Sequence, residues 1–419
     1  MEKSTRKAIA AGSIGNAMEF YDWGIYGYFA AVISEKFFPP GNDFVALLST
    51  FAVFAVGFFM RPIGSLFFGP LGDRFGRQKV LSLSVILMGI GTLLIGILPT
   101  YHQIGVLAPI LLVVARLIQG FSAGAEWGSS TSFLVEYAPQ NRRGFYGSFQ
   151  QFSTIGGMLL SSLIATLFVT ILSDKALNAW GWRIPFIIGI IIGIIGLYMR
   201  SQVKETPKFR ETLSEGKDSK SPLLEILKHP KGIFVAIGFT ISWTVCYYVL
   251  LTYMPTYIKE VMDLSYADGL VSNLIVLIFL MIFIPITGLL SDRFGRRPLL
   301  LISCGGLAVF SYPLFLLIGS SFLSILLPQL LLAIFIVCFA GPGPAALAEV
   351  FPTRVRNSSL SIGYNIGVAL FGGTAPFIAT ALVQWTDNKI SPTFYVIICG
   401  IITFFVILGM KEKANAEID

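Results

Sequence analysis

The chain has 419 residues, of which 55% are hydrophobic and 13% are charged, and its mean hydropathy is +0.76. This composition is too apolar for a single soluble core, so it excludes a soluble globular protein and predicts an all-α polytopic membrane protein. The formal net charge is +7. Because the basic residues cluster in short loops between apolar segments, we interpret this charge as a topology signal, and nothing indicates nucleic acid as a partner.

Apolar stretches long enough to cross a bilayer predict about twelve transmembrane spans. They lie near residues 12–34, 45–68, 80–98, 105–134, 145–172, 183–200, 232–257, 268–290, 299–318, 322–347, 358–385 and 392–410. One long hydrophilic stretch falls midway between them. We therefore predict four regions, which are an N-terminal six-helix bundle at 1–200, a cytoplasmic linker at 201–231, a C-terminal six-helix bundle at 232–410 and a short cytoplasmic tail at 411–419.

The loops that carry most of the 30 Lys and Arg residues follow every second span, beginning with the segment before the first one. Short loops rich in Lys and Arg stay inside the cell. We therefore expect a multi-pass protein of the cell inner (cytoplasmic) membrane, embedded in the lipid bilayer, with both termini in the cytoplasm.

Ionisable residues inside the first and fourth spans are candidates for proton chemistry. Glu19 and Asp22 stand three residues apart on one helical face, and the fourth span adds Arg116 and Glu126. Each such residue costs several kcal/mol in hydrocarbon unless it faces a cavity or a partner (about 3 kcal/mol or more). Two carboxylates one turn apart in a poorly solvated site do not both ionise easily, which suits proton binding. The alternative is a static buried ion pair that fixes helix packing.

Aromatic and amide side chains within the spans are candidates for binding a solute. Trp243 and Tyr247 share a helical face, and aromatic rings can wall a cavity or hold a cation. A zwitterion would place its cationic end near the acids and rings and its carboxylate near Arg116. For each ring, packing in the core or against lipid is the alternative. The candidate solute-binding residues are Tyr26, Gln119, Trp243, Tyr247, Tyr248, Tyr364 and Asn365.

The sequence contains an internal repeat. GPLGDRFGRQK at 69–79 returns as GLLSDRFGRRP at 288–298, and EYAPQNRRG at 136–144 returns as EVFPTRVRNSS at 349–359. Two related halves of this kind are typical of membrane transporters. We expect the repeated charges to form a breakable cluster that closes the cytoplasmic side. The alternative is that they are short basic turns that set topology. The candidate gate residues are Asp73, Arg74, Arg77, Arg142, Asp292, Arg293 and Arg296.

The repeated loop resembles the signature loop of the major facilitator superfamily. GNAMEFYDWGIYGYFA (15–30), RLIQGFSAGAEWG (116–128) and WGWRIPF (180–186) resemble the metabolite:proton symporter branch, most closely its proline/betaine osmoprotectant transporters. The similarity covers nearly the whole chain. It implies twelve helices in two pseudo-symmetric bundles, alternating access and proton-coupled import of a small zwitterionic solute. It also implies that the protein functions as a monomer and needs no cofactor other than the proton gradient.

Other functions stay open at this level. Members of the same branch carry 2-oxoglutarate, citrate or shikimate, so a symporter of a carboxylate metabolite is the main alternative. Only Arg61 and Arg116 lie within spans, which ranks multiply charged anions lower. A drug/proton antiporter or a channel is less favoured, and no nucleophile–base pair or metal-ligand cluster in the spans indicates an enzyme. Only nine residues follow Met410, which argues against osmotic regulation through a long heptad tail.

Overall fold

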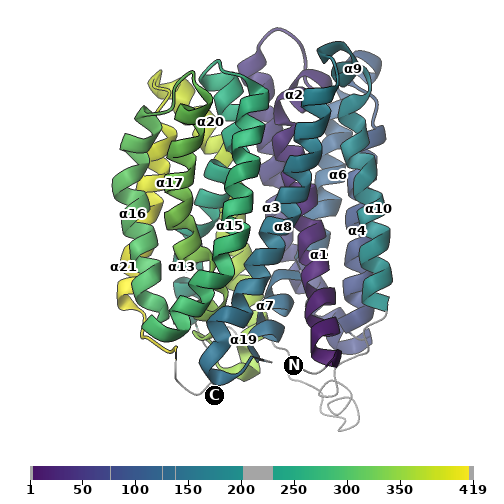
Figure 1. The fold of residues 1–419 in the computed structure, drawn as a ribbon. Helices are drawn as coiled ribbons and strands as arrows, with labels where there is room; N and C mark the ends of the chain where they lie inside the picture. The colour runs from purple at the N-terminus through teal and green to yellow at the C-terminus, as the bar shows by residue number, and fades with distance from the viewer. Residues whose placement is uncertain (1–2, 76, 125, 137, 202–229, 415–419) are drawn as a thin grey trace.

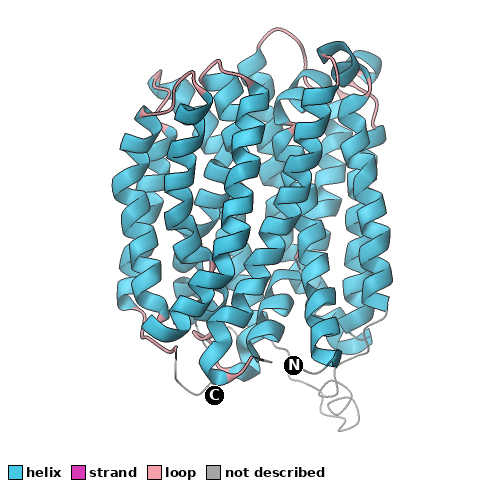
Figure 2. Ribbon diagram, in the orientation of Figure 1, coloured by secondary structure: helices cyan, strands magenta, loops and turns pink. Residues whose placement is uncertain are grey.

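The computed structural model describes residues 3–75, 77–124, 126–136, 138–201 and 230–414. Within these ranges all regular secondary structure is helical (Figure 2). The long helices run side by side along one axis, and the described chain begins and ends at the same end of the molecule (Figure 1). We call this the proximal end and the opposite one the distal end. The predicted linker at 201–231 and the last residues of the predicted tail lie almost entirely outside the described residues.

The N-terminal half contains the first six predicted spans. Its elements are α1 Lys3–Tyr28, α2 Ala30–Phe37, α3 Asp43–Phe75, α4 Arg77–Ile97, α5 Tyr101–Ile104, α6 Leu107–Ala123, α7 Glu126–Glu136, a 3-10 turn at Gln140–Arg142, α8 Arg143–Ile171, α9 Asp174–Ala179, a second 3-10 turn at Gly181–Arg183 and α10 Ile184–Ser201.

The C-terminal half contains the other six spans. Its elements are α13 Pro230–Cys246, η3 Tyr247–Tyr253, α14 Met254–Thr256, η4 Tyr257–Val261, α15 Tyr266–Phe294, α16 Arg296–Leu316, α17 Phe322–Ala340, α18 Gly343–Ala348, α19 Thr353–Gly367, η5 Val368–Gly372, α20 Ala375–Thr386 and α21 Pro392–Gly409. The elements η3, η4 and η5 are π-helical turns, a rare geometry that occurs frequently at functional sites.

The described helices account for the predicted spans. Ten of them are long and apolar enough to cross a membrane, and a shorter apolar helix lies at Ser82–Ile97. Helix α1 corresponds to the first predicted span, which is less apolar because it carries Glu19 and Asp22. Large apolar side chains such as Phe234 (73% exposed) and Phe405 (66% exposed) cover the outside, while Arg61 and Arg116 are fully buried. This inversion of the soluble pattern is expected where lipid surrounds the protein.

The two halves pack against each other in a symmetric way. Helix α8 packs on α15, and α3 packs on α19 and α20. Helices α3 and α15 are each the second span of their half, and α8 and the α19–α20 segment are each the fifth. The two contacts are therefore equivalent under the internal repeat, as expected for duplicated halves related by a pseudo-twofold axis.

Glycines bring α3 and α6 into backbone contact beside the centre. A Cβ added at Gly120 would lie 1.7 Å from the carbonyl oxygen of Gly57, and one added at Gly64 would lie 1.9 Å from that of Phe121. Small residues allow this close approach between membrane helices. Because Arg61 and Arg116 lie next to these crossings in the sequence, the crossings fix where both guanidinium groups enter the interior.

Candidate functional site

A fully buried ion pair joins α1 and α3. The Nη1 atom of Arg61 lies 2.5 Å from Oε1 of Glu19, and neither side chain is exposed. Arg61 Nε also donates to Oδ1 of Asn365 on α19 at 3.1 Å, and Asn365 Nδ2 donates to the carbonyl oxygen of Gly124 at 2.9 Å. Asn365, a predicted solute-binding residue, thus connects the ion pair of the N-terminal half to the C-terminal half. Arg61 lies within a predicted span, but it was not predicted as a site residue.

Arg116 lies in a group of three aromatic rings, which we call the ring cage. Its guanidinium carbon is 4.1 Å from the ring centre of Trp23, 4.2 Å from that of Tyr26 and 5.1 Å from that of Phe54. Nη1 donates to Oε1 of Gln119 at 2.8 Å. Nε and Nη2 are buried and have no hydrogen-bond partner among the described residues. Trp23 and Phe54 were not predicted, whereas Tyr26, Gln119 and Arg116 were.

Asp22 is linked to Arg116 through two intermediate side chains. Its carboxylate lies within hydrogen-bond reach of the Thr92 side chain on α4, and Gln119 Nε2 donates to Thr92 Oγ1 at 2.7 Å. Gln119 in turn accepts from Arg116. The result is a buried polar chain, Asp22, Thr92, Gln119 and Arg116, that lies within the N-terminal half.

The two carboxylates of α1 therefore have different neighbours. Glu19 faces Arg61 and the C-terminal half, while Asp22 faces Thr92 and Gly189 inside the N-terminal half. Residues three apart on a helix differ by about 60° in direction, which is enough to send the two side chains to different helices. The structure does not pair Glu19 with Asp22 in one site.

Glu126 lies closer to the proximal end than Asp22 does. Its Oε1 accepts from Ser84 Oγ at 2.8 Å, and Ser84 precedes Thr92 by two turns of α4, a rise of about 12 Å. Glu126 is buried on α7. This position separates it from the polar chain that connects Asp22 to Arg116.

A second aromatic cluster lies where α7 meets the C-terminal half. The Trp127 ring stacks on Tyr364 with centres 3.6 Å apart and an interplanar angle of 5°, and Trp243 lies edge-on to both rings. Tyr248 packs against Phe58 of α3 at 5.1 Å. The predicted residues Trp243, Tyr248 and Tyr364 thus lie between the halves. Trp127 was not predicted, although it directly follows Glu126.

Tyr247 has a different environment from the other predicted aromatic residues. It lines a small void together with Trp243, Cys246 and Ser303, within the C-terminal half. It follows that Tyr247 and Tyr248, adjacent in the π-helical turn η3, face different parts of the molecule.

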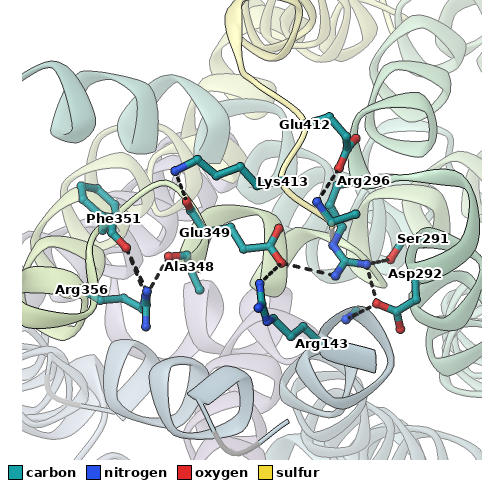
Figure 3. Close-up of polar contacts among 12 residues, drawn as sticks. Arg143, Ser291, Asp292, Arg296, Ala348, Glu349, Phe351, Arg356, Glu412 and Lys413 are labelled. Carbon is teal, nitrogen blue, oxygen red and sulfur yellow. Dashed lines mark hydrogen bonds and ion pairs between the residues drawn. The ribbon is translucent and has the colours of Figure 1, made fainter. Parts of the chain in front are cut away.

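A buried network that includes four charged residues, which we call the proximal cluster, joins the halves at the proximal end. The carboxylate of Asp292 accepts from the backbone N–H groups of Gly144 at 2.8 Å and Phe145 at 2.9 Å, at the start of α8. Arg296 donates to Asp292 at 2.7 Å and to Glu349 at 3.3 Å (Figure 3). The charged members of the cluster are Arg143, Asp292, Arg296 and Glu349.

The proximal cluster balances a desolvation cost against ion pairing. Burial raises the pKa of Glu349, and the nearby guanidinium groups of Arg296 and Arg143 oppose that shift. Arg143 Nη1 lies 3.6 Å from the Glu349 carboxylate. Buried ion pairs gain little net energy once desolvation is counted, so a cluster of this kind can be broken without a large input of energy.

Two further contacts surround the proximal cluster. Arg356 donates to Glu136 at 3.1 Å and to the carbonyl oxygens of Ala348 and Phe351. The chain after α21 also reaches this region, where Lys413 Nζ donates to the Glu349 carbonyl oxygen at 3.0 Å (Figure 3). All of these hydrogen bonds are formed in this structure.

The predicted gate residues are only partly those that make these contacts. Asp292 and Arg296, both predicted, make these contacts, whereas Arg142 and Arg293 are exposed and the unpredicted Arg143 supplies the second buried guanidinium group. The side chains of Asp73, Arg74 and Arg77 lie outside the described residues. Glu349, Glu136 and Arg356 were not predicted, although all three lie in the second repeated motif.

Contacts also join the two halves at the distal end. Ser162 Oγ of α8 donates to Asn273 Oδ1 of α15 at 3.2 Å, and the Phe51 ring packs edge-on against Tyr253 at 5.4 Å. Helix α1 touches η3 at Gly27, where an added Cβ would lie 2.2 Å from the Thr252 side chain. Among the described residues, contacts therefore join the two halves at both the proximal and the distal end.

Comparison with known proteins assigns the family. The sequence model of the family described as "Sugar (and other) transporter" matches residues 8–223 and again 210–418. The chain belongs to this family of transporters. The double match agrees with the two halves, and membership confirms the expected resemblance to the major facilitator superfamily and identifies a multi-pass membrane protein.

Curated members of the family resemble this transporter over nearly its whole length. The proline/betaine transporter of Escherichia coli (strain K12) is 40% identical, with 98% of this chain and 84% of the relative covered. The glycine betaine/proline/ectoine/pipecolic acid transporter OusA of Dickeya dadantii is 39% identical with the same coverage. A putative proline/betaine transporter of Staphylococcus aureus is 36% identical, covering 97% of this chain and 88% of the relative.

Solved structures of a family member confirm the fold class. The proton:xylose symporter XylE bound to 6-bromo-6-deoxy-D-glucose has a TM-score of 0.80 at 20% identity, covering 99% of this chain and 98% of that one. The inward open XylE of E. coli has a TM-score of 0.74 at 20% identity, with 97% of each chain covered. The transporter therefore has the major facilitator fold, as predicted.

Proposed function

We propose that this protein is a proton-coupled symporter that imports a small zwitterionic solute, such as glycine betaine or proline, by alternating access. The solutes for which the similar proteins are named support this solute class, and the name of XylE as a proton:xylose symporter supports proton coupling. The observation that carries the proposal is the buried polar chain from Asp22 through Thr92 and Gln119 to Arg116. It connects an acid that can take up a proton to a cation that can bind a carboxylate.

The charges at the centre favour a solute with one carboxylate. Arg61 is paired with Glu19 at 2.5 Å, so its charge is already neutralised. Among the described central residues, Arg116 is a guanidinium without an acid within ion-pair distance, and its Nε and Nη2 atoms have no partner. One unpaired cation suits one carboxylate. A di- or tricarboxylate would bring more negative charge into this buried site than Arg116 can neutralise.

Proton binding at Asp22 acts on Arg116 through Thr92. The Thr92 hydroxyl donates to the Met88 carbonyl oxygen at 3.0 Å. An ionised Asp22 competes for that hydroxyl proton, whereas a protonated Asp22 donates its own proton to Thr92. Either change alters the acceptor for Gln119, which holds Nη1 of Arg116. Glu19 and Glu126 are secondary candidates for coupling, since both are buried acids of the same half.

Alternating access requires that each end opens in turn. We infer that the proximal end faces the cytoplasm, because the loops rich in Lys and Arg and both described ends of the chain lie there. The proximal cluster is then the cytoplasmic gate, in which α15 of one half caps α8 of the other. The protein works as a monomer in the inner membrane, since one chain supplies both halves of the path.

Transport in proteoliposomes tests the proposal. Radiolabelled glycine betaine, proline, 2-oxoglutarate, citrate and shikimate are offered under an inward proton gradient, with and without a protonophore. We expect concentrative uptake of glycine betaine or proline that the protonophore abolishes. Uptake of citrate or 2-oxoglutarate alone would favour a carboxylate symporter. Stimulated efflux would indicate antiport, and dependence on sodium would contradict proton coupling.

A further inference from the structure

The ring cage around Arg116 is rigid. The Trp23 ring packs against Phe58 with centres 3.7 Å apart and lies edge-on to Phe54 at 5.4 Å. Tyr26 packs against Phe54 at 5.8 Å, and its hydroxyl donates to the Thr50 carbonyl oxygen at 3.0 Å. Trp23 and Tyr26 are at most 2% exposed. The three rings are therefore held in place by contacts that do not involve Arg116.

Arg116 is held less completely than the rings that surround it. Of its three guanidinium nitrogens only Nη1 has a hydrogen-bond partner among the described residues, and Nε and Nη2 are buried without one. Leaving a buried charged donor unsatisfied is costly, whereas its attraction to the rings needs no directional bond. The guanidinium can therefore leave this position when a partner for its free nitrogens arrives.

The cage has the chemistry of a binding site for an organic cation. Faces of Trp, Tyr and Phe rings attract a positive charge within about 6 Å of their centres, and aromatic cages recognise quaternary ammonium ligands in this way. All three rings satisfy this distance toward the Arg116 guanidinium. In this structure the protein's own cation occupies a site that a methylated ammonium group would fit chemically.

We propose that Arg116 is a stand-in for the cationic group of the solute. When the solute binds, its quaternary ammonium takes the position among Trp23, Tyr26 and Phe54, and the displaced guanidinium binds the solute's carboxylate through Nε and Nη2. This inference rests on the proposed function and specifies its substrate class as quaternary ammonium carboxylates, with trimethylated compounds preferred over secondary amines such as proline. Arg116 and the ring cage are the specificity-determining residues.

The inference predicts a gain of binding when the arginine is removed. Arg116→Ala empties the cage, so tetramethylammonium should bind the purified transporter about threefold to thirtyfold more tightly than it binds the wild type, the range expected for cation–ring contacts. Glycine betaine should bind more weakly to the same variant, because its carboxylate loses a partner. Isothermal titration calorimetry at constant ionic strength measures both affinities.

Two further variants make the test specific. Arg116→Ala combined with Phe54→Leu should lose the gain for tetramethylammonium, because one wall of the cage is missing. Arg183→Ala is the matched control: it removes a guanidinium that lies 4.4 Å from the Trp182 ring, away from the cage, and should leave tetramethylammonium binding unchanged. Equal tetramethylammonium affinity in the wild type and Arg116→Ala would overturn the inference, as would a gain that survives Phe54→Leu.

Phe54→Leu alone covers the case in which Arg116→Ala does not fold. It retains an apolar side chain and Arg116, and it should weaken glycine betaine binding about threefold to thirtyfold while changing proline binding less. Unchanged glycine betaine affinity would overturn the inference. These outcomes are distinct from failure of the proposed function, which would appear in the wild type as an absence of proton-driven uptake of both glycine betaine and proline.

Discussion

Replacing Asp292 by Asn should open the proximal end. Asp292 lies in the last turn of α15, and its carboxylate accepts from two backbone N–H groups at the start of α8 and from Arg296. It therefore neutralises the positive end of the α8 helix dipole from the other half of the protein. Asn retains one acceptor oxygen of similar shape, so the substitution removes the charge and leaves the packing largely intact.

The magnitude follows from the contacts that weaken. Hydrogen bonds to a charged group contribute about 1.5–3 kcal/mol, and a carboxylate at a partly buried helix N-terminus contributes up to about 2 kcal/mol. Asn keeps part of the first contribution, and Arg296 keeps Glu349 as a partner. We therefore expect a net loss of about 2–3 kcal/mol from the closed state, which raises the ratio of open to closed protein by about 30-fold to 150-fold.

Cysteine labelling measures this shift. Ser148 is fully buried against Gly288 at the contact between α8 and α15, so Ser148→Cys reports opening in a protein whose four native cysteines have been replaced. Asp292→Asn should increase its labelling by a membrane-impermeant maleimide applied from the proximal side. Asp268→Asn, the same change in the first turn of α15 at its other end, is the control and should have little effect. Equal labelling of the Asp292→Asn protein and its parent would refute the gate assignment.

Other substitutions test the remaining contacts. Glu19→Gln and Arg61→Gln should each lower the free energy of unfolding by about 3–5 kcal/mol, which is measured as a lower Tm in detergent. The double variant should be more stable than the sum of the two single losses predicts, and additive losses would contradict a direct pair. Thr92→Val should impair gradient-driven uptake more than solute counterflow, because it breaks the polar chain and changes the size of the side chain little. Equal loss of both activities would argue that Thr92 has a packing role. Glu136→Gln should change proximal labelling by less than about fivefold, since Glu136 is 39% exposed and the buried Arg356 keeps the carbonyl oxygens of Ala348 and Phe351 as acceptors.

The fold could be predicted because its signals are local or periodic. The lengths of the apolar segments define the spans, and the repeated DRFGR motif identifies the two halves before any contact is known. The π-helical turns were not predicted. They place Tyr247 and Tyr248 in different environments, and nothing in the spacing of two adjacent tyrosines indicates this.

The site could be predicted by residue type but not by partner. Glu19 and Asp22 were recognised as buried acids, yet Glu19 pairs with Arg61 and Asp22 faces Thr92 because helices from distant parts of the sequence flank α1 on different sides. The sequence places Arg61 within a span without indicating its partner, and its contact with Asn365 shows that it lies between the halves. Such contacts depend on how helices cross, which composition and periodicity do not encode.

At the proximal end, too, the sequence identifies the type of residue but not the one that makes the contact. The doublet Arg142 and Arg143 offers two equivalent guanidinium groups, and the sequence does not indicate which one turns inward. In the structure Arg143 begins α8 and is buried against Glu349, while Arg142 ends the preceding 3-10 turn and is exposed. The position of the helix start decides between them.

Simultaneous measurement of solute and proton flux tests the central claim most directly, namely that Asp22 carries the coupled proton. Proteoliposomes loaded with a pH-sensitive dye receive radiolabelled glycine betaine, and internal acidification is compared with solute entry. The wild type should acidify its lumen as glycine betaine enters. Asp22→Asn should still exchange glycine betaine across the membrane without acidification. Acidification at the wild-type rate in Asp22→Asn would contradict the account.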